Sequence, residues 1–201
     1  MNILAISGSS RRHGNTEILL EQALQGAQKE GAETELYTVQ GKKLEPCDGC
    51  RSCDKAGKCH IDDDVQIVHG KMANADGIIF GTPIYSYSMT PQLKIIIDRT
   101  VSFRPPLGTL TNKVAGVVVT AASLGLIDAL KDLYFWIVTR QMLPANFVAA
   151  YGQDKGEVES LPICMKAAED LGRQVVQIAE KKFEYPRGIF GAKHGYGTWV
   201  K

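Results

Sequence analysis

Residues 2–16 read "NILAISGSSRRHGNT" and place a strand, a polar loop and the start of a helix in direct succession. The apolar run ends at Ser7, and beyond the loop apolar residues recur at helical spacing as far as Gly31. Four further runs with strand character follow at 33–39, 77–83, 113–122 and 146–152, with amphipathic segments between them. Strands that alternate with helices need crossover connections. We therefore predict an α/β fold with a doubly wound, five-stranded parallel sheet and helices on both faces.

The helices are predicted from apolar residues that recur at helical spacing behind capping residues. The acidic residues 62–64 are interpreted as a helix cap favoured by the helix dipole. In chain order the expected core faces are Val65, Val68 and Met72 after 62–64; Leu93, Ile96, Ile97 and Val101 after Thr90-Pro91; Ile127, Leu130, Tyr134 and Ile137 after Ser123; and Met165, Ala168, Val175 and Ala179 in the last helix.

The chain has 201 residues, 44% of them hydrophobic, and a formal net charge of +1. This composition fits one globular domain, which we place at 1–184, followed by a tail at 185–201 that is rich in glycine and aromatic residues. The balanced charge gives no electrostatic reason to expect nucleic acid or an anionic membrane as a partner. The N-terminus lacks the basic region of a secretory signal, and no apolar run is long enough to cross a bilayer, so we expect a cytoplasmic protein.

In an open α/β sheet, ligands bind beyond the carboxyl ends of the strands, and three such ends carry suggestive residues. The first loop, 7–16, offers hydroxyls, glycines for close backbone approach, two arginines and the N–H groups of a helix start, which together suit one phosphate group. The alternative is a polar turn in which Asn15 or Thr16 simply caps the helix. The residues that offer these groups are Ser7, Ser9, Ser10 and Thr16 with their hydroxyls and Arg11 and Arg12 with their charge.

The second strand end, "GTPIYSYSMT" at 81–90, combines a stiffening proline with apolar and aromatic side chains that suit a planar ring such as a flavin. Taken alone, its two tyrosines also fit partly buried loop aromatics. The third end, "VTAASLG" at 119–125, has small side chains that let backbone amides approach the edge of a ring. Further along, Lys94, Asp98 and Arg99 fit a surface salt bridge as well as a catalytic role.

Together, "ISGSSRRHGNT", "GTPIYSYSMTPQLKIIIDR" and "TAASLG" resemble the NADPH-dependent FMN reductase family, a flavodoxin-like group, over most of the chain. The resemblance implies that the first loop binds the FMN phosphate, that the second wraps the isoalloxazine and that the third contacts its pyrimidine edge. It also implies homodimers or homotetramers. The residues that take these roles by resemblance are Ser9, Arg11, Asn15 and Thr16; Pro83, Ile84, Tyr85, Ser86 and Tyr87; and Thr120, Ser123 and Gly125.

Residues 46–59, "PCDGCRSCDKAGKC", hold four of the five cysteines, in a loop insertion at 42–61 that we call the cysteine loop. Cytoplasmic thiols stay reduced, so this grouping predicts metal binding or catalysis sooner than disulfides. The spacing C-x2-C-x2-C-x5-C is close to the bacterial ferredoxin run and favours a 4Fe-4S cluster. Zinc sites with four cysteines usually pair two separated C-x2-C turns; zinc and unligated thiols stay open as alternatives. The predicted ligands are Cys47, Cys50, Cys53 and Cys59.

This combination of a flavin cradle and a compact cysteine motif resembles the iron-sulfur flavoproteins, a branch of the flavin reductases. FMN exchanges one or two electrons and a 4Fe-4S cluster exchanges one, so we predict an FMN-dependent oxidoreductase that relays electrons from ferredoxin or NAD(P)H to a small or protein acceptor. The main alternative is an NAD(P)H-dependent FMN or quinone reductase whose cysteines are structural or bind zinc. A flavodoxin-type carrier and a redox sensor are further alternatives.

The remaining notable residues are interpreted as structural. Cys164 is expected to be a small buried hydrophobe, and Trp136 and Trp199 are expected to pack in the fold. The four histidines show no metal-ligand spacing among themselves, and His60 is expected to be an exposed loop residue near the cysteines.

Overall fold

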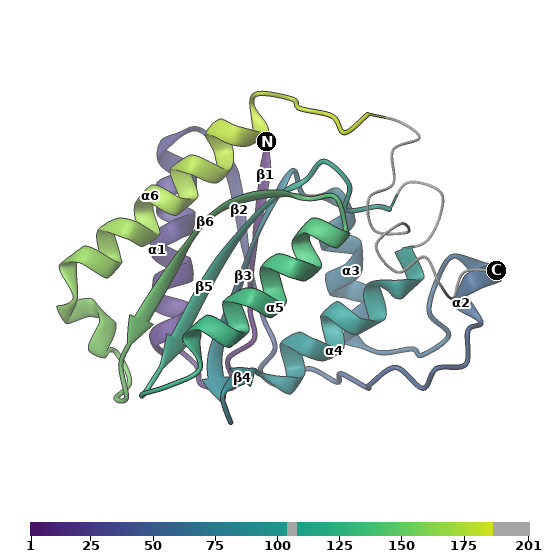
Figure 1. Cartoon of the computed structure of the whole chain (residues 1–201), viewed down its shortest axis with the longest axis horizontal. Coiled ribbons are helices and arrows are strands. Elements are labelled where there is room, and N and C mark those ends of the chain that lie inside the picture. Colours follow the sequence, from purple (N-terminus) through teal and green to yellow (C-terminus); the bar gives the residue numbers. More distant parts are fainter. Residues whose placement is uncertain (104–107, 187–201) are drawn as a thin grey trace.

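The computed structural model describes residues 1–103 and 108–186 and shows one twisted sheet between two layers of helices (Figure 1). Five strands are parallel, which confirms the predicted doubly wound fold. The elements are β1 (Asn2–Ser7), α1 (Asn15–Lys29), β2 (Glu33–Thr38), α2 (Cys53–Ala56), α3 (Asp64–Asn74), β3 (Gly77–Tyr85), β4 (Ser88–Met89), α4 (Pro91–Arg99), a 3-10 helix (Thr100–Phe103), β5 (Val114–Ala121), α5 (Leu126–Thr139), β6 (Leu143–Tyr151), a second 3-10 helix (Glu157–Ser160) and α6 (Pro162–Ala179).

The strand order places the first loop and the second loop side by side. The order is β2-β1-β3-β5-β6, so β1 lies between β2 and β3, and the direction in which the chain crosses the sheet reverses there. The loops that follow β1 and β3 therefore leave the sheet on opposite sides of one crevice at its carboxyl edge. In Figure 1 this edge is the lower one, toward which the arrowheads of β5 and β6 point.

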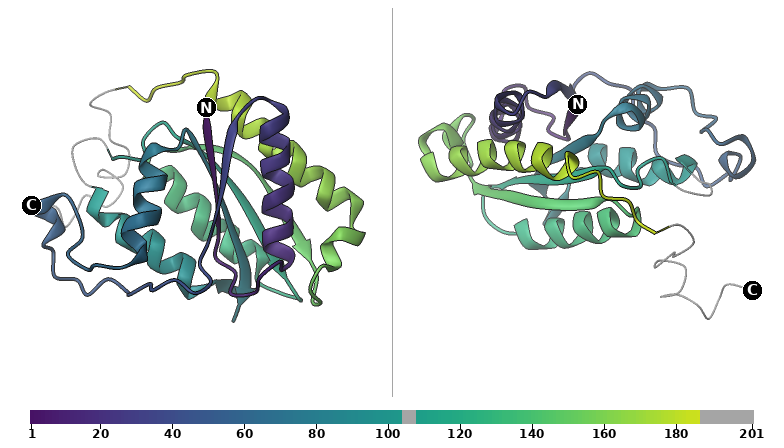
Figure 2. Two further views of the ribbon diagram at one scale, coloured as in Figure 1. Left: turned by 180° about the vertical axis from the view of Figure 1, so that it is seen from behind. Right: turned by 90° about the horizontal axis from the view of Figure 1, so that it is seen from above.

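Two apolar layers hold the helices on the sheet. Helices α3, α4 and α5 cover one face and α1 and α6 cover the other, as the views in Figure 2 also show. Most of the expected core residues of α3 and α4 are confirmed, since Val68, Met72, Leu93 and Ile96 are fully buried. Val101, expected on the same face, lies in the 3-10 helix that follows α4 and is only partly buried. Tight burial of this kind contributes about 1.5–3 kcal/mol for each large aliphatic side chain.

The predicted core face of α5 is partly wrong. Ile127 is 72% exposed, whereas the buried face consists of Leu126, Ala129, Leu133 and Ile137. Helix α5 has apolar residues on most sides, so the helical spacing of apolar residues fits two adjacent faces of the helix equally well. The sequence therefore did not decide which of these faces packs on the sheet.

Helices α1 and α6 approach each other closely because two glycines lie at their crossing. A Cβ on Gly26 would lie 2.0 Å from the carbonyl oxygen of Glu169, and one on Gly172 would lie 1.7 Å from that of Ala23. Neither position tolerates a side chain unless the helices separate. The crossing anchors α1, whose first turn carries part of the first loop.

Several details of the elements differ from the predictions. Strand β4 was not predicted: it pairs antiparallel with the end of β3 and makes the second loop a hairpin. Cys164 is partly exposed, not buried, although it packs against the α1–α6 core. Trp136 packs edge-on against Phe80, with ring centroids 5.2 Å apart, as expected. Trp199 and most of the tail predicted at 185–201 lie outside the described residues.

Within 1–103 and 108–186, no helix combines the length and apolar character needed to span a membrane.

Candidate functional site

The first loop folds around its own hydroxyl groups. Ser7 and Ser9 are buried: the Ser7 Oγ accepts a hydrogen bond from the Ser9 N–H at 3.4 Å, and the Ser9 Oγ accepts one from the Arg11 N–H at 3.1 Å. The N-cap of α1 is Gly14, so the alternative in which Asn15 or Thr16 caps the helix is wrong. No side chain of the described residues caps α1, which leaves its first N–H groups without an intrahelical partner. Such a helix start beside hydroxyl groups fits a phosphate.

Contacts from the first loop reach the ends of β5 and β6. Thr16 Oγ1 and Thr120 Oγ1 lie 2.7 Å apart in a buried hydrogen bond. The Asn15 amide donates to the carbonyl oxygens of Gly152 and Asp154 at 3.2 and 2.8 Å. The exposed Arg11 donates to the neighbouring carbonyl of residue 153 at 3.4 Å. Residues 152–154 are therefore a fourth loop of the site, which the sequence analysis missed although "GQDKG" follows the last strand at the same edge.

The second loop is a hairpin whose tip carries two residues in the left-handed region. Strand β3 ends at Tyr85, and Ser86 and Tyr87 turn the chain with φ values of 47° and 70° before β4 begins. A two-residue turn of this kind usually contains glycine or asparagine, so this tip stores backbone strain. Tyr87 is 65% exposed and Tyr85 40% exposed, so neither is the partly buried aromatic of the alternative interpretation. The tip presents aromatic surface at the carboxyl edge.

The three predicted loops meet around this hairpin. The Ser10 Oγ lies 3.0 Å from the Tyr85 hydroxyl, which joins the first loop to the second. Gly125, the N-cap of α5, has φ of 98°, and a Cβ there would lie 2.7 Å from the Cα of Tyr87 and 2.8 Å from Ile84. Glycine is thus needed for both the conformation and the contact. The other predicted residues lie at the same edge: Pro83 is half-buried at the end of β3, Thr120 is buried on β5 and Ser123 is exposed on the third turn.

The cysteine loop lies apart from the sheet, between β2 and α3. Figure 1 shows α2, its single helical turn, at the right-hand side beyond α3 and α4. Cys47 and Cys50 are exposed, Cys53 and Cys59 are partly exposed, and none forms a disulfide within the described chain. The turn ends at Gly57, which adopts the left-handed conformation with φ of 68°.

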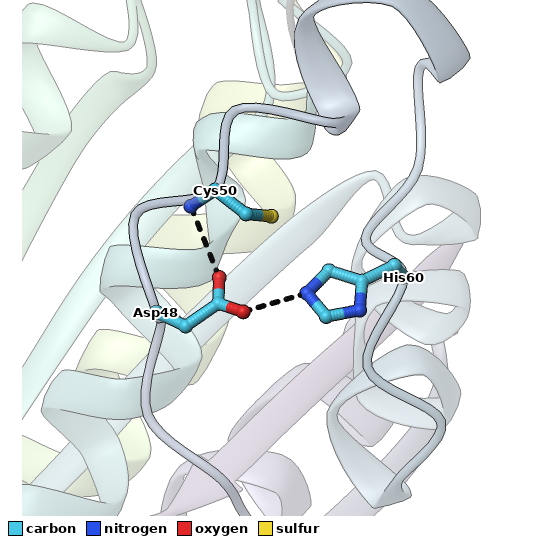
Figure 3. A group of neighbouring side chains, drawn as sticks. All are labelled: Asp48, Cys50 and His60. Atoms are coloured by element: carbon cyan, nitrogen blue, oxygen red, sulfur yellow. Dashed lines mark hydrogen bonds and ion pairs between the residues drawn. The ribbon is translucent and has the colours of Figure 1, made fainter.

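A carboxylate organises the first half of the cysteine loop (Figure 3). Asp48 accepts a hydrogen bond from the Cys50 N–H at 3.1 Å through one oxygen, and its other oxygen lies 2.8 Å from the Nε2 of His60. The N–H and thiol of Cys50, followed by His60, lower the pKa of Asp48 to about 2. His60 is exposed, as expected, but it is bound to Asp48.

The thiols are close enough to interact but are not arranged around a single ion. In the described part of the chain, no three of the four sulfur atoms lie within 4.8 Å of one another. Four thiolates on one zinc ion would lie about 3.8 Å apart, given Zn–S bonds of about 2.3 Å. Burial and the charge of Asp54 raise the pKa of Cys53, and the neighbouring Cys59 and Cys47 raise it further. A 4Fe-4S cluster binds each cysteine sulfur to a different iron, so its ligands lie farther apart than those of one zinc ion, and the spacing of these thiols fits that wider arrangement.

The base of the cysteine loop is closed by a buried ion pair. Arg99, the last residue of α4, and Asp63 have side chains 1% and 0% exposed, and the Arg99 Nη1 lies 2.5 Å from the Asp63 Oδ2. Arg99 also donates to the carbonyl oxygens of Glu45 and Ile61, each at 3.1 Å, and Asp63 accepts the Glu45 N–H at 2.8 Å. The expected surface position of Arg99 is therefore wrong.

The neighbouring expectations for this region are confirmed. Lys94 and Asp98 form the expected surface pair on α4. Asp63 caps α3 by accepting the Val65 N–H, as the helix-cap interpretation of 62–64 requires.

These features define a class. A sheet of order β2-β1-β3-β5-β6, with a phosphate-type loop, an aromatic hairpin and a small-residue turn at its switch point, is the framework of a flavodoxin-like flavoprotein.

Comparison with known proteins identifies the family. The model of the NADPH-dependent FMN reductase family matches residues 1–154. An iron-sulfur flavoprotein of Methanocaldococcus jannaschii is 35% identical over 190 residues, which cover 90% of this chain and 98% of that protein. One from Methanosarcina thermophila is 33% identical over 154 residues, 76% of this chain and 81% of that protein. Among solved structures, RosB with bound 8-demethyl-8-formylriboflavin-5'-phosphate has a TM-score of 0.74 at 19% identity, covering 92% of this chain and 82% of RosB, and shares the fold.

The chain therefore belongs to the NADPH-dependent FMN reductase family, in the branch of the iron-sulfur flavoproteins. It is a flavin-dependent oxidoreductase that binds FMN. This result confirms the resemblance on which the first and second loops were assigned.

Proposed function

We propose that this protein relays electrons between FMN and a 4Fe-4S cluster, taking them from ferredoxin or NAD(P)H and passing them to a small or protein acceptor. One observation carries the proposal: four free thiols, held together on a loop outside the sheet, occur in the same chain as the loops of a flavin site. We expect this relay to work in the cytoplasm, in a homodimer or homotetramer built from the domain 1–184.

The flavin is assigned to the loops at the carboxyl edge. The N–H groups at the start of α1 and the polar side chains of the first loop suit the phosphate. The hairpin tip suits the ring, and Gly125 brings the third turn against it. The Asn15 Oδ1 is buried without a hydrogen-bond partner among the described residues, so it can accept from a hydroxyl group of FMN but not from the ionised phosphate, which has no donor. The proposed contacts are Ser7, Ser9, Ser10, Arg11, Asn15, Thr16, Pro83, Ile84, Tyr85, Ser86, Tyr87, Thr120, Ser123 and Gly125.

The cluster is assigned to the four thiolates of the cysteine loop. When bound, FMN supplies one- or two-electron chemistry and the cluster supplies one-electron chemistry. The chain's own residues would hold and orient the cluster. Its proposed ligands are Cys47, Cys50, Cys53 and Cys59, and Asp48 fixes the backbone at Cys50. No side chain of the site is needed as a general acid.

The deciding experiment is iron, acid-labile sulfide and flavin analysis on one anaerobic preparation. We expect about four irons and four sulfides per flavin, because four thiolates hold a cluster of that composition. Cys50→Ala should lose iron and the broad visible absorption while it keeps the yellow flavin. Cys164→Ala, which alters a cysteine on α6, should keep both. Iron retained at the wild-type level in Cys50→Ala would contradict the ligand assignment.

A second candidate is an NAD(P)H-dependent FMN or quinone reductase without an iron-sulfur cluster. The observation that favours it is the close grouping of Asp48, Cys50 and His60, whose ligand atoms all lie within 4.8 Å, a grouping that suits a zinc ion. The same preparation decides between the two, since this candidate predicts flavin with zinc and no iron. Steady-state turnover with NADPH would further separate this second candidate from a flavodoxin-type carrier.

A further inference from the structure

Arg99 is the residue on which both ends of the cysteine loop converge. Its guanidinium contacts Glu45, two residues before the first cysteine, and Ile61 and Asp63, shortly after the last one. Each of these contacts is to chain outside the four cysteines, so Arg99 joins the two ends of the loop. Asp63 reinforces the closure because it accepts the Glu45 N–H with the same oxygen that receives Arg99.

Arg99 carries its charge in the interior of the protein, so it is not part of an ordinary surface ion pair. The side chain is 1% exposed, and its Nε is buried without a hydrogen-bond partner in the residues that the structure describes. Burial lowers the pKa of Arg99, but Asp63 and, to a smaller extent, the Cys59 thiol raise it by more, so the guanidinium stays charged. Because Arg99 donates to the carbonyl oxygen of Ile61, two residues after Cys59, this buried cation is a fixed charge at the end of the proposed cluster loop.

Helix α4 connects this charge with the flavin loops. At its start, the Thr90 hydroxyl donates to the carbonyl oxygen of Gly8 in the first loop at 2.9 Å. Arg99 is the last of the nine residues of α4, so the two ends lie about 13 Å apart at 1.5 Å per residue. One rigid element thus sets the position of the cysteine loop relative to the flavin loops.

We propose that Arg99 is the positioning residue of the cysteine loop, and that its buried charge favours the reduced state of the cluster bound there. The second half of this inference rests on the proposed function, whereas the first half concerns the chain alone. A positive charge stabilises the added electron of a reduced cluster, and low exposure limits screening by solvent and salt. Asp63 opposes this effect, because it partly neutralises Arg99.

The first arm of the test measures loop closure in the full chain purified in air. Trypsin can cleave the loop after the exposed residues Arg51, Lys55 and Lys58, and cleavage becomes faster when the backbone there is held less firmly, because a protease needs a locally unfolded segment. We expect Arg99→Gln and Arg99→Lys to be cleaved at least tenfold faster than the wild type, because neither reproduces the guanidinium fork. Lys94→Gln, which removes an exposed cation from the same helix, is the matched control and should match the wild type. If both Arg99 variants are cleaved no faster than Lys94→Gln, the positioning role is overturned.

The second arm measures the midpoint potential of the cluster in anaerobic protein. Arg99→Gln should shift the reduction equilibrium about tenfold toward the oxidised cluster, or about 59 mV for one electron. Asp63→Asn should shift it in the opposite direction, because Arg99 is then no longer neutralised. If Arg99 had only a structural role, both substitutions would shift the midpoint potential in the same direction. That result would overturn the proposed effect of the charge.

The two arms separate this inference from the proposed function. Wild-type protein without iron would refute the cluster, while the trypsin arm would still decide the role of Arg99. FMN content equal to the wild type shows that each variant is folded. If Arg99→Gln does not fold, Asp63→Asn decides the charge effect: a potential that is unchanged or lowered overturns it.

Discussion

At the scale of single residues, the shape of the flavin loops depends on individual hydrogen bonds between side chains. Thr16 and Thr120 share a buried hydrogen bond that joins the start of α1 to β5. Thr16→Ala should leave the Thr120 hydroxyl without this partner, which lowers the free energy of unfolding by about 1–1.5 kcal/mol. Loss of the Thr16 hydroxyl from the phosphate loop should separately weaken FMN binding about tenfold. Fluorescence titration of flavin-free protein measures the affinity. Thr16→Ser keeps the hydroxyl and is the control; equal affinity in Thr16→Ala and the wild type would contradict a role in the phosphate loop.

Gly125 tests the contact between the third turn and the hairpin. Gly125→Ala introduces both a left-handed alanine and a Cβ 2.7 Å from the backbone of Tyr87, so the hairpin tip must move. We expect FMN affinity to fall by at least tenfold. Gly31→Ala has the same conformational cost, since φ there is 83°, but its Cβ meets nothing within 4 Å, and FMN binding should not change. Similar affinities in the two variants would show that the tip does not bind the ring.

At the scale of elements, the crossing of α1 and α6 limits what the sequence can tolerate. Gly172→Ala forces the two helices apart, and overpacking of this kind costs about 1–3 kcal/mol of unfolding free energy. Gly70→Ala is the matched control on α3: its Cβ meets nothing within 4 Å, so the higher helix propensity of alanine should stabilise the protein by about 0.5–1 kcal/mol. Urea unfolding measures both changes. If Gly172→Ala is as stable as the wild type, α1 and α6 must pack less closely at their crossing than the structure shows.

At the scale of the whole molecule, the buried pair at the base of the cysteine loop makes stability depend on pH. Burial raises the pKa of Asp63, but Arg99 and the N–H groups of Glu45 and Val65 lower it by more, and the net direction is downward. A folded-state pKa below the unfolded value of about 3.9 means that the ionised carboxylate stabilises the fold above that pH. The stabilisation is lost as the pH falls through the folded-state pKa.

Asp63→Asn tests this dependence. At pH 7 the variant should be less stable than the wild type by about 3 kcal/mol, because Arg99 is left buried without its counter-charge. The difference should begin to shrink below about pH 4, where the carboxylate of the unfolded wild type takes up a proton, and should disappear as the pH falls through the lower folded-state pKa. Urea unfolding at pH 7, 5 and 3.5 measures it, with the exposed neighbour Asp62→Asn as the control. A difference that stays constant with pH would show that the pKa of Asp63 is not lowered by folding.

The sequence by itself determined the five parallel strands, the fold class and the three loops expected at the flavin. These depend on local pattern: apolar runs such as 2–7 and 77–83 specify buried strands, and the residues that follow each strand reach the same edge in any parallel sheet. The spacing of the four cysteines is likewise a local signal.

Only the tertiary structure decided which partners meet across long separations. Arg99 looked like part of a surface pair until the fold placed it against Asp63, 36 residues away. Asn15 meets the fourth loop across 139 residues, at Asp154, and the core stripe of α5 was chosen by the sheet beneath it. A local pattern fixes what each segment can bury, but the free energy of a buried charge or a helix crossing depends on what the rest of the chain brings to it.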